Sequence, residues 1–543
     1  MMQFRRDTLL QKISEAGDSW DILIVGGGAT GLGAAVDAAA RGYKTLLLEQ
    51  LDFAKGTSSR STKLVHGGVR YLAQGDIGLV REALYERGLL LKNAPHLAHD
   101  ESFVIPNYEW WGGPFYTIGL TVYDLLAGKL SLGRSKLISK KETLRRIPGI
   151  KSQGLYNGVV YHDGQFDDSR LAVNLAQTCV EQGGVLLNYF RVNGLIKENG
   201  KIKGVIATDQ ETNKEYRIAA KVVVNATGVF VDDLLAMDTP EHKPLVKPSQ
   251  GVHIVLDRSF MAGEDALMIP KTEDGRVLFA VPWHDKLVVG TTDTPLNKHS
   301  IEPVALEEEI DFIIRTASKY LERKPERKDV LSVFAGLRPL AAPSGDSTKT
   351  KEISRSHKLI VSASGLLTMT GGKWTTYRKM SEDIVDKAIE VGSLKPAACA
   401  TKHLRIHGYK EVAEQDNSLS FYGSDQEALL KLTNENKEWA QEIIPGSVYS
   451  CAQVIWAVRN EMARTVEDFL ARRVRALFLD ARLAIDMAPR VAELMAAELN
   501  RDTDWQKEQV ERFTKLANGY LLSPYYPEGT NTIGIEEKKN HSL

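Results

Sequence analysis

Arginine, lysine and histidine side chains stand beside glycine turns in three stretches of this chain. The stretches are GTSSRSTKLVHGGVRYL at residues 56–72, GLRPL at 336–340 and GGKWTTYRK at 371–379. Hydroxyl groups donate to phosphate oxygens, arginine binds them with a planar fork, and lysine adds a compact charge. Glycine lets the backbone lie close to a flat ring. These residue types predict a site for a phosphate-bearing ligand; a solvated loop with surface ion pairs is the alternative.

A glycine-rich turn, GGGATG at residues 26–31, lies between an apolar run and an Ala-rich run. The apolar run, 21–25, is typical of a buried strand, and the Ala-rich run, 32–40, has high helix propensity. The free N–H groups and the positive end of the helix dipole would then face the turn, where they favour an anion. This order predicts a dinucleotide site, whereas a purely structural glycine turn is the alternative.

Individual positions of that turn have separate tasks. Gly26 permits the tight bend, Gly28 lets a pyrophosphate approach the backbone, and Gly31 lets helix and strand pack closely. Glu49 ends the next strand, where a ribose hydroxyl needs an acceptor. The motif alone does not distinguish FAD from NAD. A second strand that runs into a small-residue turn, KVVVNATG at 221–228, offers another close approach of backbone, and the pair favours a flavin.

The composition limits which classes of protein this chain can belong to. The chain has 543 residues, a net charge of −1 and 43% hydrophobic residues, and its three cysteines lack CxxC spacing. We therefore expect a multidomain globular protein of a reducing compartment, with no metal site and no nucleic-acid partner, since the latter normally requires a basic surplus. No apolar run approaches eighteen residues and no signal peptide is evident, which predicts a soluble or peripheral cytoplasmic protein.

The order of predicted elements places the motifs. Strands, glycine turns and helices alternate over the first 400 residues, with helices predicted at 77–93 and 169–182. An alternating pattern at 251–295 predicts an antiparallel sheet inserted between nucleotide-binding segments. Beyond residue 400 strands largely stop, and we expect a helical domain. One of its helices is predicted to run over 454–472 with a row of charges at i, i+4 spacing.

Residues 108–133 hold many aromatic and aliphatic side chains and few charges, among them Trp110, Trp111, Phe115 and Tyr116. Packing in the core or at a domain interface is one interpretation. The other is a patch that dips into a bilayer, because Trp and Tyr favour the headgroup level.

The chain contains, in this order, GGGATGLG, TSSRSTKLVHGGVRYL, VNATG, GTTDT, GLRPL, GGKWTTYRK and DFLARRVRALFLD. In this combination it resembles the FAD-dependent glycerol-3-phosphate dehydrogenases of the aerobic, respiratory type. The resemblance implies an α/β fold: a glutathione-reductase-like FAD-binding Rossmann domain, an inserted antiparallel-sheet substrate domain and a C-terminal helical cap domain. We expect an oxidoreductase region at 1–400, with FAD-binding segments at about 20–105, 160–250 and 335–395, substrate-sheet segments at about 106–159 and 251–334, and the helical domain at 401–543.

The resemblance also implies an activity. It is oxidation of sn-glycerol 3-phosphate at C2 to dihydroxyacetone phosphate, by hydride transfer to FAD, with electrons passed to membrane quinone. The implied location is peripheral, on the inner face of the cell membrane, with residues 108–133 as the attachment. A soluble oxidase that uses oxygen, a flavin oxidase of amino or hydroxy acids, and a non-catalytic flavin-binding module are the alternatives. The oligomeric state is left open, with a homodimer as one expectation.

Site residues follow from the resemblance and from the glycine turns together. For the cofactor, we expect non-covalent FAD bound by Gly26, Gly28, Gly31, Glu49, Thr57, Ser58, Ser59, Gly67, Gly228, Gly371 and Gly372. For the substrate, the expected residues are His66, Arg70, Tyr71, Thr292, Arg338 and Lys373.

Oxidation at C2 also requires a base for the hydroxyl proton. His66 titrates near neutral pH and is the first candidate, and Lys373 with a depressed pKa is the second. Arg338 hardly deprotonates, but it can stabilise a developing alkoxide. These three are the predicted catalytic residues.

Overall fold

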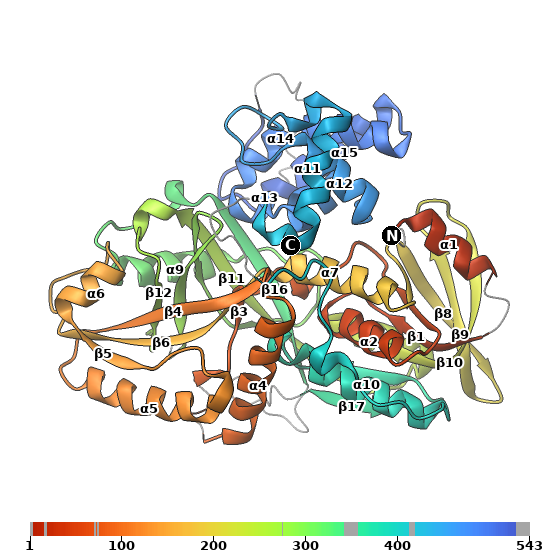
Figure 1. Ribbon diagram of the computed structural model, residues 1–543, viewed down its shortest axis with the longest axis horizontal. Helices are drawn as coiled ribbons and strands as arrows, with labels where there is room; N and C mark the ends of the chain where they lie inside the picture. Colours follow the sequence, from red (N-terminus) through yellow and green to blue (C-terminus); the bar gives the residue numbers. More distant parts are fainter. Residues whose placement is uncertain are drawn as a thin grey trace, which may run out of the picture.

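A computed structural model describes residues 4–15, 19–69, 72, 75–273, 275–341, 357–411 and 419–527. Two β-sheets lie side by side, each flanked by helices, and a helical region formed by the last part of the chain lies across both (Figure 1). In the described ranges, no helix is long and apolar enough to cross a membrane.

The first sheet contains the predicted nucleotide-binding strands. Its order is β17 (Lys358–Val361), β18 (Leu367–Thr370), β10 (Glu215–Asn225), β1 (Trp20–Val25), β2 (Thr45–Leu48) and β7 (Val185–Leu187), while β8 (Phe190–Glu198) and β9 (Lys201–Asp209) extend from β10. The strand β1 pairs in parallel with both β2 and β10. The carboxyl ends of these three strands therefore lie at one edge, as a doubly wound sheet requires for a ligand.

Helices cover this sheet through small side chains. The helix α2 (Ala29–Ala40) begins in the glycine turn and packs between α7 (Asp168–Glu181) and α10 (Tyr377–Val391). Most residues of α2 are alanine or glycine, and nearly all of them are buried. The predicted strand–turn–helix unit is confirmed.

The second sheet is largely antiparallel and joins two distant parts of the chain. Its order is β15 (Thr294–Pro295), β11 (Val246–Asp257), β14 (Lys286–Gly290), β13 (Leu278–Trp283), β12 (Ala266–Ile269), β4 (Ala98–Asn107), β6 (Asn157–Phe166) and β3 (Leu64–Val65), with β16 (Ser332–Ala341) beside β11 and β5 (Lys136–Ser139) beside β6. The antiparallel pairing of β11, β14 and β13 confirms the pattern predicted for residues 251–295.

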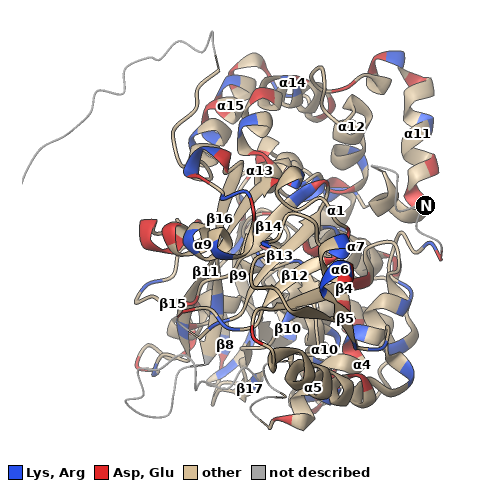
Figure 2. Ribbon diagram, turned by 90° about the vertical axis from the view of Figure 1, so that its left-hand side faces the viewer, with Lys and Arg blue, Asp and Glu red and all other residues tan. Residues whose placement is uncertain are grey.

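Helices at the outer side of this sheet are α4 (Ile77–Asn93), α5 (Gly112–Ala127), α6 (Lys140–Arg146) and α9 (Glu307–Tyr320). The helix predicted at 77–93 is confirmed as α4. The helix α5 lies at the edge of the molecule (Figure 1) and carries almost no charged side chains (Figure 2).

The packing interpretation of residues 108–133 is confirmed for one face of α5 and wrong for the other. Leu120 and Tyr123 of α5 are buried, but Trp110 is 74% exposed and Leu125 is 75% exposed. The exposed large side chains here are Trp110, Trp111, Phe115, Ile118, Val122 and Leu125. We call these six residues the α5 apolar surface. Composition could not separate the two interpretations, because both require the same side chains.

The helical region contains α11 (Gln426–Glu435), α12 (Cys451–Asn460), α13 (Ala476–Leu479), α14 (Ala481–Leu499) and α15 (Thr503–Asn518). The single helix predicted over 454–472 is wrong. The chain leaves α12 at Asn460, Met462 takes the left-handed φ of 51°, and a wide π-helical turn follows at Asp468–Arg473. This break turns the charged row inward, toward the first sheet.

A histidine joins α7 to this helical region. The Nε2 atom of His407 lies 2.7 Å from the Asp425 carboxylate, and its Nδ1 atom lies 2.5 Å from Glu181. Burial alone would lower the pKa of His407, but hydrogen bonds to the two carboxylates outweigh it and raise the pKa to about 9.

Protein stability should therefore depend on pH through His407. The folded-state pKa exceeds the unfolded value of about 6.5, so the stabilisation is complete below that pH and is lost as pH rises through about 9. We expect the melting temperature of the wild type to fall between pH 6.5 and 9. His407→Gln should melt lower at pH 6 and show a flatter profile. Parallel profiles of the two proteins would contradict this assignment.

Candidate functional site

Two adjoining cavities lie where the two sheets meet. One, of about 310 Å³, lies against the second sheet, and the other, of about 240 Å³, lies at the carboxyl edge of the first sheet. Both are lined by Thr57, Pro339 and the segment 371–374, which therefore forms their junction. We call them the substrate cavity and the nucleotide cavity.

The nucleotide cavity is formed by backbone and small side chains. Among its lining residues are Gly26, Gly27, Gly28, Ala29, Glu49, Thr57, Ser58, Thr227 and Gly228. The N-terminus of α2 opens here, with Gly28 as its N-cap. The Ser58 Oγ accepts a 2.9 Å hydrogen bond from the Ala29 N–H, which fixes the loop 56–60 against the start of the helix.

Gly31 lies behind this cavity and has a packing task. A Cβ at this position would lie 1.9 Å from the carbonyl oxygen of Gly26. Gly26 itself has a φ of 111°, which favours glycine. The two glycines thus allow α2 to start directly at the end of β1.

Glu49 follows β2 at the edge of the nucleotide cavity. It accepts hydrogen bonds from the N–H groups of Gly27, at 2.6 Å, and Leu51, at 2.8 Å. Burial raises the pKa of this carboxyl, and the two N–H groups oppose that rise. A helix N-terminus, a backbone cradle and a carboxylate one strand away fit the pyrophosphate and ribose of FAD, and the segment 371–374, which lines both cavities, would contact the flavin part of the cofactor.

Besides Gly31, two residues predicted to bind the cofactor, Ser59 and Gly67, do not line the nucleotide cavity. Ser59 is buried, and its Oγ donates to the Gly56 carbonyl. The Gly67 N–H donates to the Tyr123 hydroxyl at 2.7 Å, and the neighbouring Gly68 lines the substrate cavity instead. The Tyr123 hydroxyl in turn donates to Asp163 at 2.6 Å. Tyr123 thereby connects α5 to the loop that carries His66.

The substrate cavity has a polar and an apolar end. Its polar residues include Arg60, Thr62, His66, His253, Arg276, Thr292, Arg338 and Lys373. Its apolar residues include Leu64, Val69, Phe103, Met268, Val277 and Phe279. The structure therefore brings together four of the predicted substrate residues: His66, Thr292, Arg338 and Lys373. The other two, Arg70 and Tyr71, lie outside the described residues.

Arg338 reaches the substrate cavity from β16. A Cβ on Gly251 of the neighbouring strand would lie 2.3 Å from its Nη2 atom, so this glycine makes room for the guanidinium. The Nη1 atom lies 3.3 Å from the Asp293 carboxylate, and Nη2 donates to the Thr291 hydroxyl at 3.1 Å. These contacts fix the orientation of the fork and leave it at the cavity wall.

The other predicted residues differ in how they are held. The backbone N–H of His66 donates to the Thr375 hydroxyl at 3.3 Å, and Lys373 lines both cavities. Thr292 is buried, and its hydroxyl donates to Glu309 at 2.8 Å while it accepts from the Val252 N–H. The Thr292 hydroxyl thus links strand β11 to helix α9.

Sequence reasoning missed His253. Its ring stacks on Phe334 with centroids 4.9 Å apart, and its Nε2 lies 3.0 Å from the Thr62 hydroxyl. Burial, then the nearby Arg338 and Lys63 charges, hold the pKa of His253 well below its usual value, so the ring is neutral. The period of two in the predicted strand could have found it, because Gly251 and His253 share one face of β11.

Two family models match the chain. "FAD dependent oxidoreductase" matches residues 21–378, and "C-terminal domain of alpha-glycerophosphate oxidase" matches residues 371–509. The mitochondrial glycerol-3-phosphate dehydrogenase of Schizosaccharomyces pombe is 38% identical over 95% of this chain and 89% of its own length. The Homo sapiens protein of the same name is 38% identical over 93% of this chain and 74% of its length.

A solved structure agrees with these matches. The glycerol-3-phosphate dehydrogenase from Bacillus halodurans, crystallised with FAD, is 31% identical and has a TM-score of 0.79, covering 97% of this chain and 100% of that chain. The predicted fold class and the predicted cofactor, FAD, are confirmed. The chain belongs to the family of FAD-dependent glycerol-3-phosphate dehydrogenases.

Proposed function

We propose that this protein oxidises sn-glycerol 3-phosphate at C2 to dihydroxyacetone phosphate. The observation that carries the proposal is the polar end of the substrate cavity, where Arg338 and Lys373 lie beside the junction with the nucleotide cavity. A phosphorylated three-carbon alcohol is a dianion, and a planar fork with a compact ammonium suits its phosphate oxygens. The names of the relatives support the same substrate.

Each cavity residue has a proposed task. FAD, when bound, supplies the hydride acceptor. Arg338 binds substrate oxygen and stabilises the charge that develops on it, and Lys373 holds the substrate against the junction. The imidazole of His66, which lines the substrate cavity, takes the C2 hydroxyl proton, with the Lys373 amine as the alternative base.

Anaerobic mixing with glycerol 3-phosphate tests this function. On mixing, the visible absorbance of the oxidised flavin should disappear. The substrate alone should cause this loss, without an added nicotinamide cofactor. Amino acids and hydroxy acids serve as controls, since loss of absorbance with one of these alone would favour a related flavin oxidase. If none of the compounds bleaches the flavin, the protein is a non-catalytic flavin-binding module.

His66→Gln should slow the reduction of the flavin by glycerol 3-phosphate and remove a pH dependence near neutrality. An unchanged pH profile would assign the base to Lys373.

Arg338→Lys should weaken the reaction strongly. One ammonium cannot reproduce the paired contacts of a guanidinium, and losing a charged hydrogen bond costs about 1.5–3 kcal/mol, or about ten- to hundredfold in kcat/KM. The matched control is Arg327→Lys, because Arg327 is exposed and pairs with Glu307 and Asp311 away from the cavity. If kcat/KM for glycerol 3-phosphate stays within about twofold of wild type, Arg338 does not contact the substrate.

We further propose that electrons leave to quinone in a membrane that the α5 apolar surface contacts. Leu120 and Tyr116 of α5 pack in the same apolar cluster as Phe103, Met268 and Phe279, so the apolar end of the substrate cavity approaches this helix from within. Exposed lysines and arginines follow α5 at Lys129, Arg134, Lys136 and Lys140, and such cations favour anionic lipid. We propose the inner face of the cell membrane as the location, because it supplies both the quinone and the anionic lipid.

The yield of peroxide tests the acceptor. Turnover in air without quinone should be slow and give little peroxide. Addition of a short-chain quinone should raise the turnover rate. Stoichiometric peroxide per substrate, with no gain from quinone, would identify a soluble oxidase that uses oxygen.

A further inference from the structure

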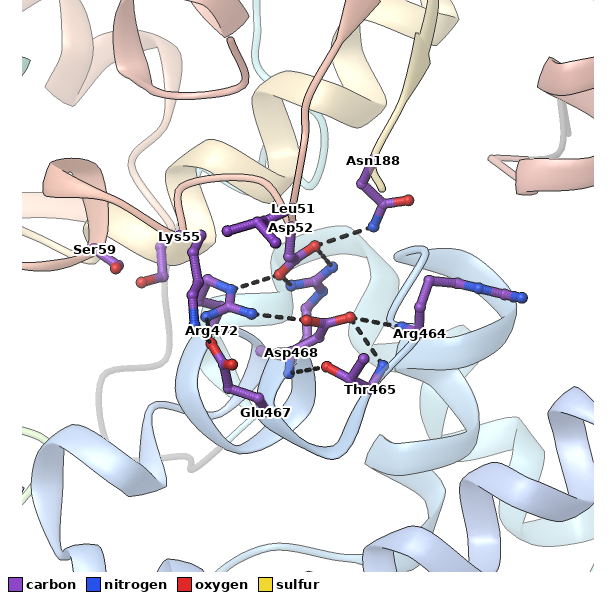
Figure 3. A network of polar contacts seen from close by, with 12 residues as sticks. Leu51, Asp52, Lys55, Ser59, Asn188, Arg464, Thr465, Glu467, Asp468 and Arg472 are labelled. Atoms are coloured by element: carbon purple, nitrogen blue, oxygen red, sulfur yellow. Dashed lines mark hydrogen bonds and ion pairs between the residues drawn. The ribbon is translucent and has the colours of Figure 1, made fainter. Parts of the chain in front are cut away.

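A cluster of buried charges joins the helical region to the loop at the rear of the nucleotide cavity (Figure 3). Its centre is Asp52, whose side chain is fully buried. The Arg472 Nε donates to its carboxylate at 2.6 Å, and Arg473 donates to both of its oxygens, at 2.7 and 2.9 Å. Asn188 completes the shell at 3.2 Å. Two guanidinium groups from one turn of the helical region thus bind a single carboxylate of the nucleotide-binding part.

The cluster of ion pairs extends beyond Asp52. Arg472 also donates to Glu467 at 2.6 Å and to Asp468 at 2.7 Å, and Glu467 pairs with Lys55. Lys55 also pairs with Glu302 at 2.6 Å, and Arg473 lies 3.9 Å from Glu461. Although burial opposes ionisation, the charges of Arg473 and Arg472 hold the pKa of Asp52 below its usual range. Bidentate guanidinium–carboxylate contacts of this kind fix geometry as well as charge.

Arg472 and Arg473 are the last two residues of the π-helical turn. In the turn Asp468–Arg473 both side chains are buried and reach the same carboxylate. Such wide turns occur often at functional sites.

The loop that Asp52 belongs to contacts the nucleotide cavity on its other side. The Leu51 N–H donates to Glu49, and the Ala54 N–H donates to the Gly27 carbonyl at 2.9 Å. Lys55 lines the cavity directly. A displacement of Asp52 would therefore move the carboxylate expected to bind ribose and the turn expected to bind pyrophosphate.

We propose that Arg472 and Arg473 are positioning residues for FAD, through Asp52, and that the C-terminal helical region controls how long the cofactor stays bound. The inference rests on the nucleotide cavity as the FAD site. It does not depend on which substrate the flavin oxidises. Removing the Asp52 charge should therefore increase the rate of FAD release. A variant at another buried carboxylate, with a similar loss of stability, should not show this increase.

The test measures FAD release from the holoenzyme. Purified protein is diluted at a temperature well below its melting point, and the rise of flavin fluorescence gives the dissociation rate. We expect Asp52→Asn to release FAD at least about tenfold faster than wild type. The matched control is Asp209→Asn, since Asp209 is a buried carboxylate that pairs with Arg6 at 2.7 Å and lines neither cavity. The control should release FAD within about threefold of the wild-type rate.

Melting temperatures separate positioning from mere stability. If Asp52→Asn and Asp209→Asn melt at similar temperatures and only the first loses FAD quickly, the proposal holds. If both release FAD at the wild-type rate, or both accelerate equally, the proposal is overturned. Should Asp52→Asn fail to fold, the charge-balanced Asp52→Asn/Arg473→Gln and the milder Arg472→Lys replace it, with the same criterion against Asp209→Asn. A holoenzyme that releases FAD as expected but is not reduced by glycerol 3-phosphate would refute the proposed function alone.

Discussion

Gly31→Ala is expected to give a protein without bound flavin. The new Cβ would lie 1.9 Å from the Gly26 oxygen and 3.0 Å from the Gly26 carbonyl carbon. Both are backbone atoms, so no side-chain rotation relieves the contact. The start of α2 must move away from β1, and its N–H groups lose their place beside the pyrophosphate.

The ratio of visible to ultraviolet absorbance in the purified protein measures this effect. Gly78→Ala in α4 is the matched control, because the nearest atom to its added Cβ is a side-chain oxygen of Asp76 at 3.9 Å. The control should keep full flavin content and melt near the wild-type temperature. A yellow Gly31→Ala protein with wild-type FAD content would mean that the cofactor does not depend on this turn.

The nucleotide-binding unit could be predicted because its signals are local. The run 21–25, the glycine turn and the Ala-rich run follow each other directly, and each imposes its own geometry. The same holds for α4, whose helical pattern lies within one segment, residues 77–93. The second sheet was predicted in part for this reason: β11, β13 and β14 are neighbours in the sequence, whereas β4 and β6 come from a separate segment that ends at Phe166, well before β11 begins at Val246.

Contacts between distant segments could not be predicted in the same way. Asp52 is paired with Arg472 and Arg473, and nothing near Asp52 in the sequence indicates a buried carboxylate. The i, i+4 spacing of the charges in the predicted helix gives no sign of burial, because that spacing is common on helix surfaces. Only the backbone break near Met462 turns them inward, and a methionine with positive φ has no sequence signature.

Side-chain direction explains the remaining differences. Ser59 and Gly67 lie in the loops that resemblance and residue type indicated, yet one packs under the loop and the other against Tyr123. A loop has no fixed period, so sequence cannot assign its faces. His253 lies on strand β11, where side chains alternate between the two faces. The alternation could therefore have assigned His253 to the same face as Gly251.

The protein should bind membranes through the α5 apolar surface, and Trp110→Ser/Trp111→Ser should largely abolish this binding. Trp110 is 74% exposed and Trp111 is 47% exposed, so both indoles are available to a bilayer without unfolding. Burying large apolar side chains contributes about 25 cal/mol per Å², or about 1.5–3 kcal/mol for each one. Losing two of them should reduce the partition coefficient by about a hundredfold or more, since each 1.4 kcal/mol is about tenfold.

Co-sedimentation with liposomes that contain anionic lipid measures this partition. The matched control is Leu430→Ser/Val448→Ser, which removes two exposed apolar side chains from the helical region, away from α5. The control should sediment like the wild type. Added salt should weaken binding by screening the cations that follow α5, while part of the binding persists because apolar burial does not depend on charge. If the wild type stays in the supernatant at low salt, the α5 apolar surface has another partner and the membrane proposal is wrong.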